Sequence, residues 1–185
     1  MNKVLIVVDV QEDFTRGALR NEDAIAALPK IHDIDEFARN NDMEVFYTMD
    51  THGDDYLNTQ EGRNLPVPHC IHMTEGWKVC PEAIIDDKLV KVIRKGTFGF
   101  PHWDVFPIVG GADEVWICGF CTDICVSANF QIIKATYPEV PIVVIDDACA
   151  GVTPTAHKAA LKVMQSCQAR VVKWDKLKKE NANEA

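Results

Sequence analysis

Residues 4–8 (Val-Leu-Ile-Val-Val) form an unbroken apolar, mostly β-branched run that ends at Asp9. A strand with one face in water alternates apolar and polar residues, whereas a continuous apolar run fits a strand covered on both faces. Strands of that kind occur in parallel sheets between two layers of helices. The run is also too short for the core of a signal peptide or for a membrane span, which needs about 20 apolar residues. This segment therefore predicts an α/β protein built around a central parallel sheet.

Strand and helix patterns alternate along the rest of the chain. Strands are expected at residues 44–48, 89–94, 114–118, 141–145 and 169–173, and helices at residues 22–41, 123–136 and 154–166. Asn21 is suited to cap the first helix, and the polar tail from residue 175 is expected to fray. This alternation predicts an α/β, doubly wound, mostly parallel sheet with helices on both faces, in a single domain over residues 1–185.

Composition narrows the class of partner. The chain has 185 residues and a formal net charge of −9, which argues against nucleic acid or an anionic membrane as the main partner. Its seven cysteines are odd in number and suggest no disulfide framework. With no recognisable targeting segment, they indicate reduced thiols and a cytoplasmic protein. A small-molecule ligand is the expected partner.

Several chemically capable residues follow the predicted strands. In open α/β sheets, ligands bind beyond the carboxyl ends of the strands, near the point where the strand order reverses. The residues expected at that edge are Asp9 after the first strand, Asp50 and His52 after the second, Lys95 after the third, and residues 119–125 after the central strand.

Cys125 is the candidate nucleophile at this edge. Its expected place in the first turn of a helix would favour the thiolate, and an adjacent Lys95 would lower the thiol pKa further. Asp9 would accept the thiol proton and later deliver it to a leaving amine. Each residue also has an ordinary alternative: Cys125 as a packing residue, Asp9 as a turn former and Lys95 as a solvated side chain.

Three motifs resemble a known family. Residues 7–14 (VVDVQEDF), 95–98 (KGTF) and 119–126 (GFCTDICV) look like the three signatures of the isochorismatase-like cysteine hydrolases, which include nicotinamidases. They occur in the family's order and span most of the chain. The resemblance implies a six-stranded parallel sheet and acyl transfer through a thioester.

The same resemblance assigns roles to individual residues. It implies a catalytic triad of Asp9, Lys95 and Cys125. It also implies a cis peptide bond just before Cys121, which would turn the backbone N–H groups of Cys121 and Cys125 inward as an oxyanion hole. Phe14 resembles a ring-stacking residue of nicotinamidases, and Phe120 is expected to contact the substrate as well.

Metal-type residues lie in the loop after the second strand. Asp50 and His52 are two positions apart, so they point to the same side of an extended chain. His69 lies in a Pro-His-Cys segment similar to one that supplies a metal-binding histidine in nicotinamidases, and related enzymes use a glutamate such as Glu61 from this loop. Two histidines and two carboxylates suit Zn²⁺, with Mn²⁺ or Fe²⁺ as alternatives. Ordinary loop histidines remain the other interpretation.

The predicted function is cysteine-dependent hydrolysis of a small carboxamide to an acid and ammonia, with nicotinamide as the first substrate to test. One alternative keeps the fold but makes the enzyme a metal-independent isochorismatase-type hydrolase or a hydrolase of carbamoyl or ureido amides. A different alternative is a non-catalytic binding module on a flavodoxin-like sheet. We also predict a homo-oligomer.

Overall fold

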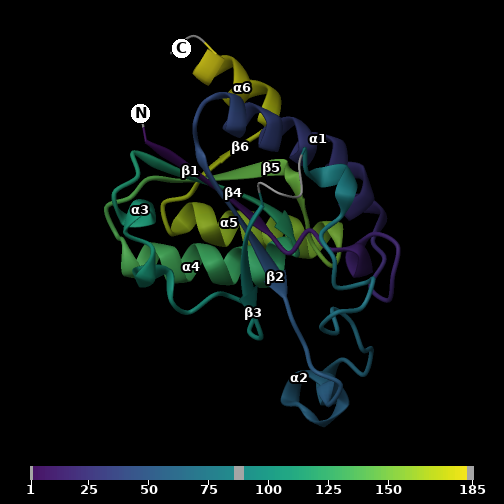
Figure 1. Ribbon diagram of the computed structural model, residues 1–185. Coiled ribbons are helices and arrows are strands. Elements are labelled where there is room, and N and C mark those ends of the chain that lie inside the picture. The colour runs from purple at the N-terminus through teal and green to yellow at the C-terminus, as the bar shows by residue number, and fades with distance from the viewer. Residues whose placement is uncertain (1, 86–89, 183–185) are drawn as a thin grey trace.

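The computed structural model describes residues 2–85 and 90–182 and contains a six-stranded sheet in the order β3-β2-β1-β4-β5-β6 (Figure 1). Neighbouring strands are parallel throughout. The chain starts at the central β1, winds out to β3, and returns through β4 to β6 at the other edge, which confirms the doubly wound prediction. The strands are β1 (Lys3–Val8), β2 (Glu44–Asp50), β3 (Lys91–Lys95), β4 (Glu114–Phe120), β5 (Ile142–Ala150) and β6 (Arg170–Val172).

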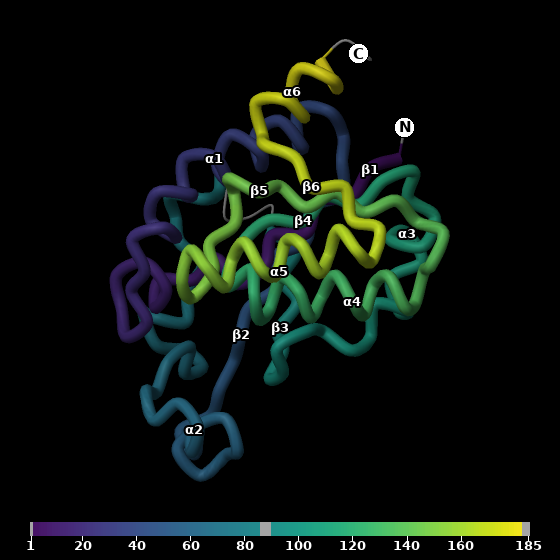
Figure 2. Tube along the Cα trace, turned by 180° about the vertical axis from the view of Figure 1, so that it is seen from behind, coloured from purple at the N-terminus to yellow at the C-terminus, as the bar shows by residue number. Residues whose placement is uncertain are grey.

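Helices cover both faces of the sheet (Figures 1 and 2). One face carries α1 (Glu22–Asn40) and α6 (Trp174–Ala182), and the other carries α4 (Ser127–Thr136) and α5 (Pro154–Ser166). Asn21 caps α1 as predicted, because its side-chain oxygen accepts bonds from first-turn N–H groups. Within the described ranges, no helix has the length and apolarity needed to cross a membrane.

The core is centred on β1. Residues 4–8 have no exposed surface, as a strand between two helical layers requires. Trp116 of the neighbouring β4 is also fully buried and stacks on Phe37 of α1, with ring centroids 6.0 Å apart. Full burial of one such large apolar side chain stabilises the fold by roughly 1.5–3 kcal/mol.

Residues 175–182 of the C-terminal tail belong to the helix α6, so the prediction that they fray is wrong; the rest of the tail lies outside the described residues. Trp174, the first residue of α6, is 1% exposed, and Leu177 is fully buried. The indole N–H of Trp174 donates to the Asp33 carboxylate at 2.6 Å, and its backbone N–H donates to Asp147 at 2.8 Å. These partners are distant in sequence, so a local polar pattern gives no sign of them.

Other differences from the prediction lie at element boundaries. β5 reaches Ala150, beyond the expected end at residue 145. The short helices α2 (Gln60–Asn64) and α3 (Pro107–Gly110) occupy segments with no predicted helix. Residue 89 of the predicted strand 89–94 lies outside the described residues, and β3 begins at Lys91.

The connection from β2 to β3 extends beyond the carboxyl edge of the sheet, where it carries α2 (Figure 1). Two isolated bridges hold it there: His52 pairs with Ile71 in parallel, and Gln11 pairs with Val79 in antiparallel orientation. The first bridge returns the chain to the end of β2. It thereby brings His69 close to His52, although the two are far apart in sequence.

Candidate active site

Four adjacent strands deliver the predicted functional residues to one place. Lys95, the last residue of β3, pairs in register with Asp50, the last residue of β2. Asp9 follows β1, which lies between β2 and β4. Cys125 lies in the turn that follows β4. The carboxyl edge of the sheet therefore gathers all four side chains, as the strand-end rule predicts.

Asp9, Lys95 and Cys125 form one buried cluster. Nζ of Lys95 lies 2.6 Å from Oδ2 of Asp9 and 3.7 Å from Sγ of Cys125. The hydroxyl of Thr48 donates to Oδ1 of Asp9 at 2.7 Å, which fixes the carboxylate. The exposed fractions of Asp9, Lys95 and Cys125 are 0%, 4% and 5%. A lysine so buried is not a solvated side chain, and this rules out the ordinary alternative for Lys95.

The electrostatics of the cluster differ from the sequence-based expectation. Burial, and then the adjacent Asp9 carboxylate, raise the pKa of the Cys125 thiol well above its ordinary value, although Lys95 opposes them. The expected lowering of this pKa is therefore wrong. Burial also raises the pKa of Asp9, an effect that the ammonium of Lys95 partly offsets. A raised thiol pKa favours the protonated form of Cys125, and Asp9 lies beside it to receive the proton.

The turn that carries Cys125 has unusual backbone geometry. The Phe120–Cys121 peptide bond is cis, as the family resemblance predicts. Gly119, just before it, has φ +118°, and a Cβ at this position would lie 2.1 Å from the carbonyl oxygen of Val8. Only glycine fits here. Cys125 then lies in a π-helical turn, Thr122–Val126, that leads into α4.

Two side chains that the sequence did not single out fix this turn. The Asn129 amide donates to the carbonyl of Cys125 at 2.9 Å, and its oxygen accepts the indole N–H of Trp103 at 3.0 Å. On the other side, Nδ1 of His157 is 2.8 Å from the hydroxyl of Thr122. The turn is thus held from two elements, α4 and α5.

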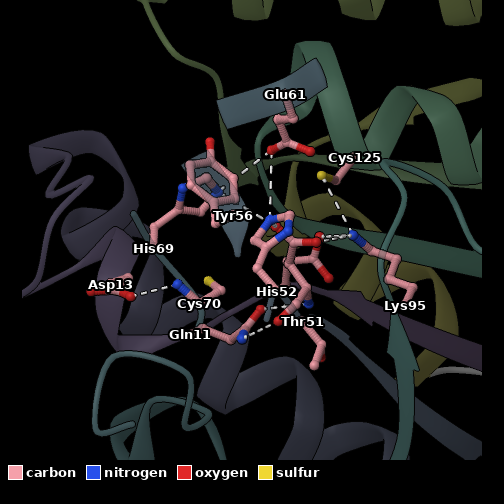
Figure 3. A network of polar contacts seen from close by, with 12 residues as sticks. Gln11, Asp13, Thr51, His52, Tyr56, Glu61, His69, Cys70, Lys95 and Cys125 are labelled. Carbon is pink, nitrogen blue, oxygen red and sulfur yellow. Dashed lines mark hydrogen bonds and ion pairs between the residues drawn. The ribbon is translucent and has the colours of Figure 1, made fainter. Parts of the chain in front are cut away.

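Asp50, His52, Glu61 and His69 converge beside this cluster. Figure 3 shows His52, Glu61 and His69 close to Lys95 and Cys125. One ligand atom from each lies within 4.8 Å of the other three. Nε2 of His52 is 3.0 Å from Asp50 and 3.6 Å from Glu61, and Nε2 of His69 is 3.6 Å from Asp50 and 3.7 Å from Glu61. Two imidazoles and two carboxylates aimed at one point fit a divalent transition-metal ion.

The orientation of His69 supports this fit. Its Nδ1 is 2.9 Å from the carbonyl oxygen of Val67. A carbonyl only accepts, so Nδ1 carries a proton, and in the neutral imidazole Nε2 then presents a lone pair to the cluster.

Gln11 and Asp13 bond the backbone at or next to metal-type residues, and sequence reasoning missed both (Figure 3). The Gln11 amide accepts from the backbone N–H of Asp50 at 2.8 Å and donates to its carbonyl at 2.9 Å. Asp13 accepts from the backbone N–H of Cys70, next to His69, at 2.7 Å. Gln11 has no exposed surface and Asp13 only 9%. The polar residues that directly follow the apolar first strand were the available signal, because buried polar groups need partners.

A cavity of about 940 Å³ opens onto both clusters. Its lining includes Cys125, Cys121, all four metal-type residues and Phe14, which meets His69 edge-on at 6.2 Å. Phe120 is fully buried in the core and does not line the cavity. The prediction that Phe120 contacts the substrate is therefore wrong, because β4 extends through this residue and places its ring in the core.

The family model for the isochorismatase domain matches residues 3–176. The chain belongs to the isochorismatase family. The nicotinamidase/pyrazinamidase of Mycobacterium tuberculosis is 30% identical over 92% of this chain and 98% of the relative.

Solved structures agree with the family assignment. A nicotinamidase of Bacillus subtilis superimposes with a TM-score of 0.80 at 27% identity, over 94% of this chain and 100% of that one. The pyrazinamidase of Pyrococcus horikoshii in complex with zinc gives a TM-score of 0.80 at 26% identity, with the same coverage of 94% and 100%.

Proposed function

We propose that this member of the isochorismatase family is a cysteine-dependent amidohydrolase of the nicotinamidase type, which hydrolyses a small carboxamide to an acid and ammonia. The observation that carries the proposal is the position of the Lys95 ammonium, in contact with both Asp9 and Cys125, of which Cys125 lines the cavity. The activities named for the relatives support it.

The reaction begins at sulfur. The Asp9 carboxylate takes the thiol proton as Sγ of Cys125 attacks the amide carbonyl carbon, so a C–S bond forms and the carbonyl oxygen becomes an oxyanion. The intermediate collapses, the C–N bond breaks, and Asp9 gives its proton to the leaving nitrogen. Ammonia departs and a thioester remains. Water then attacks the thioester, Asp9 accepts one of its protons, and that proton returns to sulfur as the C–S bond breaks.

The negative charges that develop during this reaction need fixed partners in the active site. The ammonium of Lys95 stabilises the charge that passes between Asp9 and sulfur, at 2.6 and 3.7 Å. We assign the oxyanion hole to the backbone N–H groups of Cys121 and Cys125. The π-helical turn around Cys125, which directly follows Cys121, is consistent with that assignment.

We further propose that Asp50, His52, Glu61 and His69 hold one divalent ion, with Zn²⁺ first and Mn²⁺ or Fe²⁺ as alternatives. The zinc complex of the Pyrococcus pyrazinamidase and the donor set of this chain support the choice. A bound ion would supply a Lewis acid beside the reacting carbonyl or an anchor for a ring nitrogen. Phe14, in the same cavity, offers a ring face to the substrate.

Ammonia release from pyridine-3-carboxamide, compared with ureido and carbamoyl compounds, tests the proposal. We expect turnover of the carboxamide and, by mass spectrometry of quenched reactions, an acyl adduct on Cys125. Cys125→Ala should release no ammonia, whereas Cys167→Ala, which changes a thiol outside the cavity lining, should keep full activity. Activity in Cys125→Ala would refute the mechanism, and turnover of ureido compounds alone would favour the alternative substrates.

We propose that the enzyme works in the cytoplasm. All seven cysteines are free, as expected in a reducing compartment. A homo-oligomer remains a prediction, which light scattering of the purified protein would test.

A further inference from the structure

The cavity is large for a one-ring amide. Pockets of roughly 300–1,000 Å³ enclose most of a drug-sized ligand, and this cavity of about 940 Å³ is near the top of that range. A carboxamide placed against Cys125 and the metal-type cluster would fill only its inner part. The outer part is therefore available to the rest of a larger substrate.

The outer part is marked by exposed apolar side chains. Leu65, Phe98 and Val152 line the cavity although 39%, 50% and 55% of their surfaces are exposed. They come from three separate segments, after α2, after β3 and before α5. Large apolar groups that gather at a ligand cavity usually mark a surface that a ligand covers.

The groups suited to chemistry are buried within the cavity, whereas its exposed lining combines the three apolar side chains with the uncharged polar side chains of Gln60, Asn64 and Thr97. The groups suited to chemistry, such as Cys125, Asp50 and His69, are 5%, 4% and 3% exposed. Arg20 also lines the cavity, but its guanidinium already pairs with Glu22 at 2.8 Å. The outer part therefore favours an uncharged, apolar group over an acidic one.

We propose that this outer part is an apolar subsite defined by Leu65, Phe98 and Val152, and that the substrate is a primary carboxamide whose acyl group carries an alkyl or aryl extension. The proposal rests on the amidohydrolase function proposed above. A primary amide loses only ammonia from its nitrogen side, so the acyl side must carry any group that occupies the subsite.

Three amides test the subsite: pyridine-3-carboxamide, its 5-butyl derivative, and a derivative whose side chain of the same length ends in a carboxylate. Burial of part of the butyl group should raise kcat/KM about tenfold or more over the unsubstituted amide. The carboxylate derivative should show no such gain, because its charge would lose water in an apolar site.

Substitutions in the cavity lining test whether the gain in kcat/KM arises at the proposed subsite. Phe98→Ser and Val152→Ser should bring the ratio of kcat/KM for the butyl and unsubstituted amides close to one. Val163→Ser is the matched control, because Val163 is similarly exposed at 53% but does not line the cavity. That variant should keep the ratio of the parent enzyme.

Equal kcat/KM for the butyl and unsubstituted amides, or a ratio that Phe98→Ser and Val152→Ser leave unchanged, would overturn the subsite. A change in oligomeric mass without a change in ratio would also overturn it and would assign the patch to a subunit contact. If no amide is hydrolysed, the proposed function fails, and calorimetry on Cys125→Ala decides the subsite separately. Tighter binding of the butyl amide than of the unsubstituted amide supports the subsite, and equal or absent binding overturns it.

Discussion

One carboxylate oxygen of Asp50 faces Lys95, and the other faces His52 of the metal-type cluster. Its Oδ1 lies 3.5 Å from Nζ of Lys95, and its Oδ2 lies 3.0 Å from Nε2 of His52. Lys95 in turn contacts Asp9 and Cys125. One buried carboxylate thus joins the residues proposed for acyl transfer to those proposed for metal binding, and substitutions on either side of it should have separable effects.

Replacement of Lys95 should destabilise the fold. Lys95→Met leaves the carboxylates of Asp9 and Asp50 buried without their shared cation, which should lower the free energy of unfolding by about 3–5 kcal/mol. Lys91→Met is the control on the same strand, because Lys91 pairs with Glu44 at the surface and its loss should cost at most about 1 kcal/mol. Urea unfolding measures both. Equal midpoints for the two variants would contradict this prediction.

Asp9→Asn should separate thiol reactivity from turnover. The Asp9 carboxylate raises the pKa of Cys125, so its removal should lower that pKa and increase labelling by iodoacetamide at pH 7, about tenfold for each unit of pKa. The labelling rate of both proteins should increase with pH. The parent should reach a given rate only at a higher pH than the variant. Turnover should nevertheless fall by about 10²–10⁴-fold, because the proton acceptor is lost. Slower labelling of the variant than of the parent would refute this account.

Removal of a metal ligand should leave the nucleophile intact. We expect elemental analysis after reconstitution with Zn²⁺ to give one ion per chain of the parent protein. His52→Ala should bind zinc far more weakly, while Cys125 stays open to alkylation. His72→Ala, which changes an exposed histidine beside Arg94 outside the cluster, should bind as the parent does. A parent protein that takes up no metal would rule out the assignment.

The sequence predicted the sheet and the position of the site because both follow from local patterns and a general rule. Continuous apolar runs indicate strands buried on both faces, and parallel strands bring their carboxyl ends to one edge. Asp9 follows such a run, and Asp50 and Lys95 follow two further predicted strands, so their approach needs no knowledge of side-chain packing. The pattern did not give the length of β4, and so it misplaced Phe120.

Properties that depend on distance in three dimensions were not predictable. The strand-end rule brings Asp9 towards Cys125, but the burial that most strongly raises the pKa of the thiol comes from tertiary packing around the side chain. The same holds for α6, whose first turn is fixed by a carboxylate of α1. Partners remote in sequence decide both features.

Gln11 and Asp13 should act on metal affinity through the residues they hold. Gln11→Ala would free both backbone polar groups of Asp50, and Asp13→Asn would replace one acceptor with an amide N–H that faces a backbone donor. Loss of such support should weaken zinc binding about 10–100-fold, and the unpaired buried groups should cost about 1–3 kcal/mol of stability.

Competition with a fluorescent zinc chelator gives this affinity directly, at a temperature where each variant is folded by circular dichroism. Glu12→Gln is the matched control: Glu12 lies between the other two but its side chain pairs with Arg16 at 2.8 Å. It should bind zinc as the parent does, because it touches none of the metal-type residues. Folded Gln11→Ala and Asp13→Asn proteins with the zinc affinity of the Glu12→Gln control would show that the first motif supports only the fold. A loss of zinc affinity in Gln11→Ala and Asp13→Asn, but not in Glu12→Gln, would show that the segment after β1 positions the metal ligands. The same segment begins with Asp9, the proposed proton acceptor.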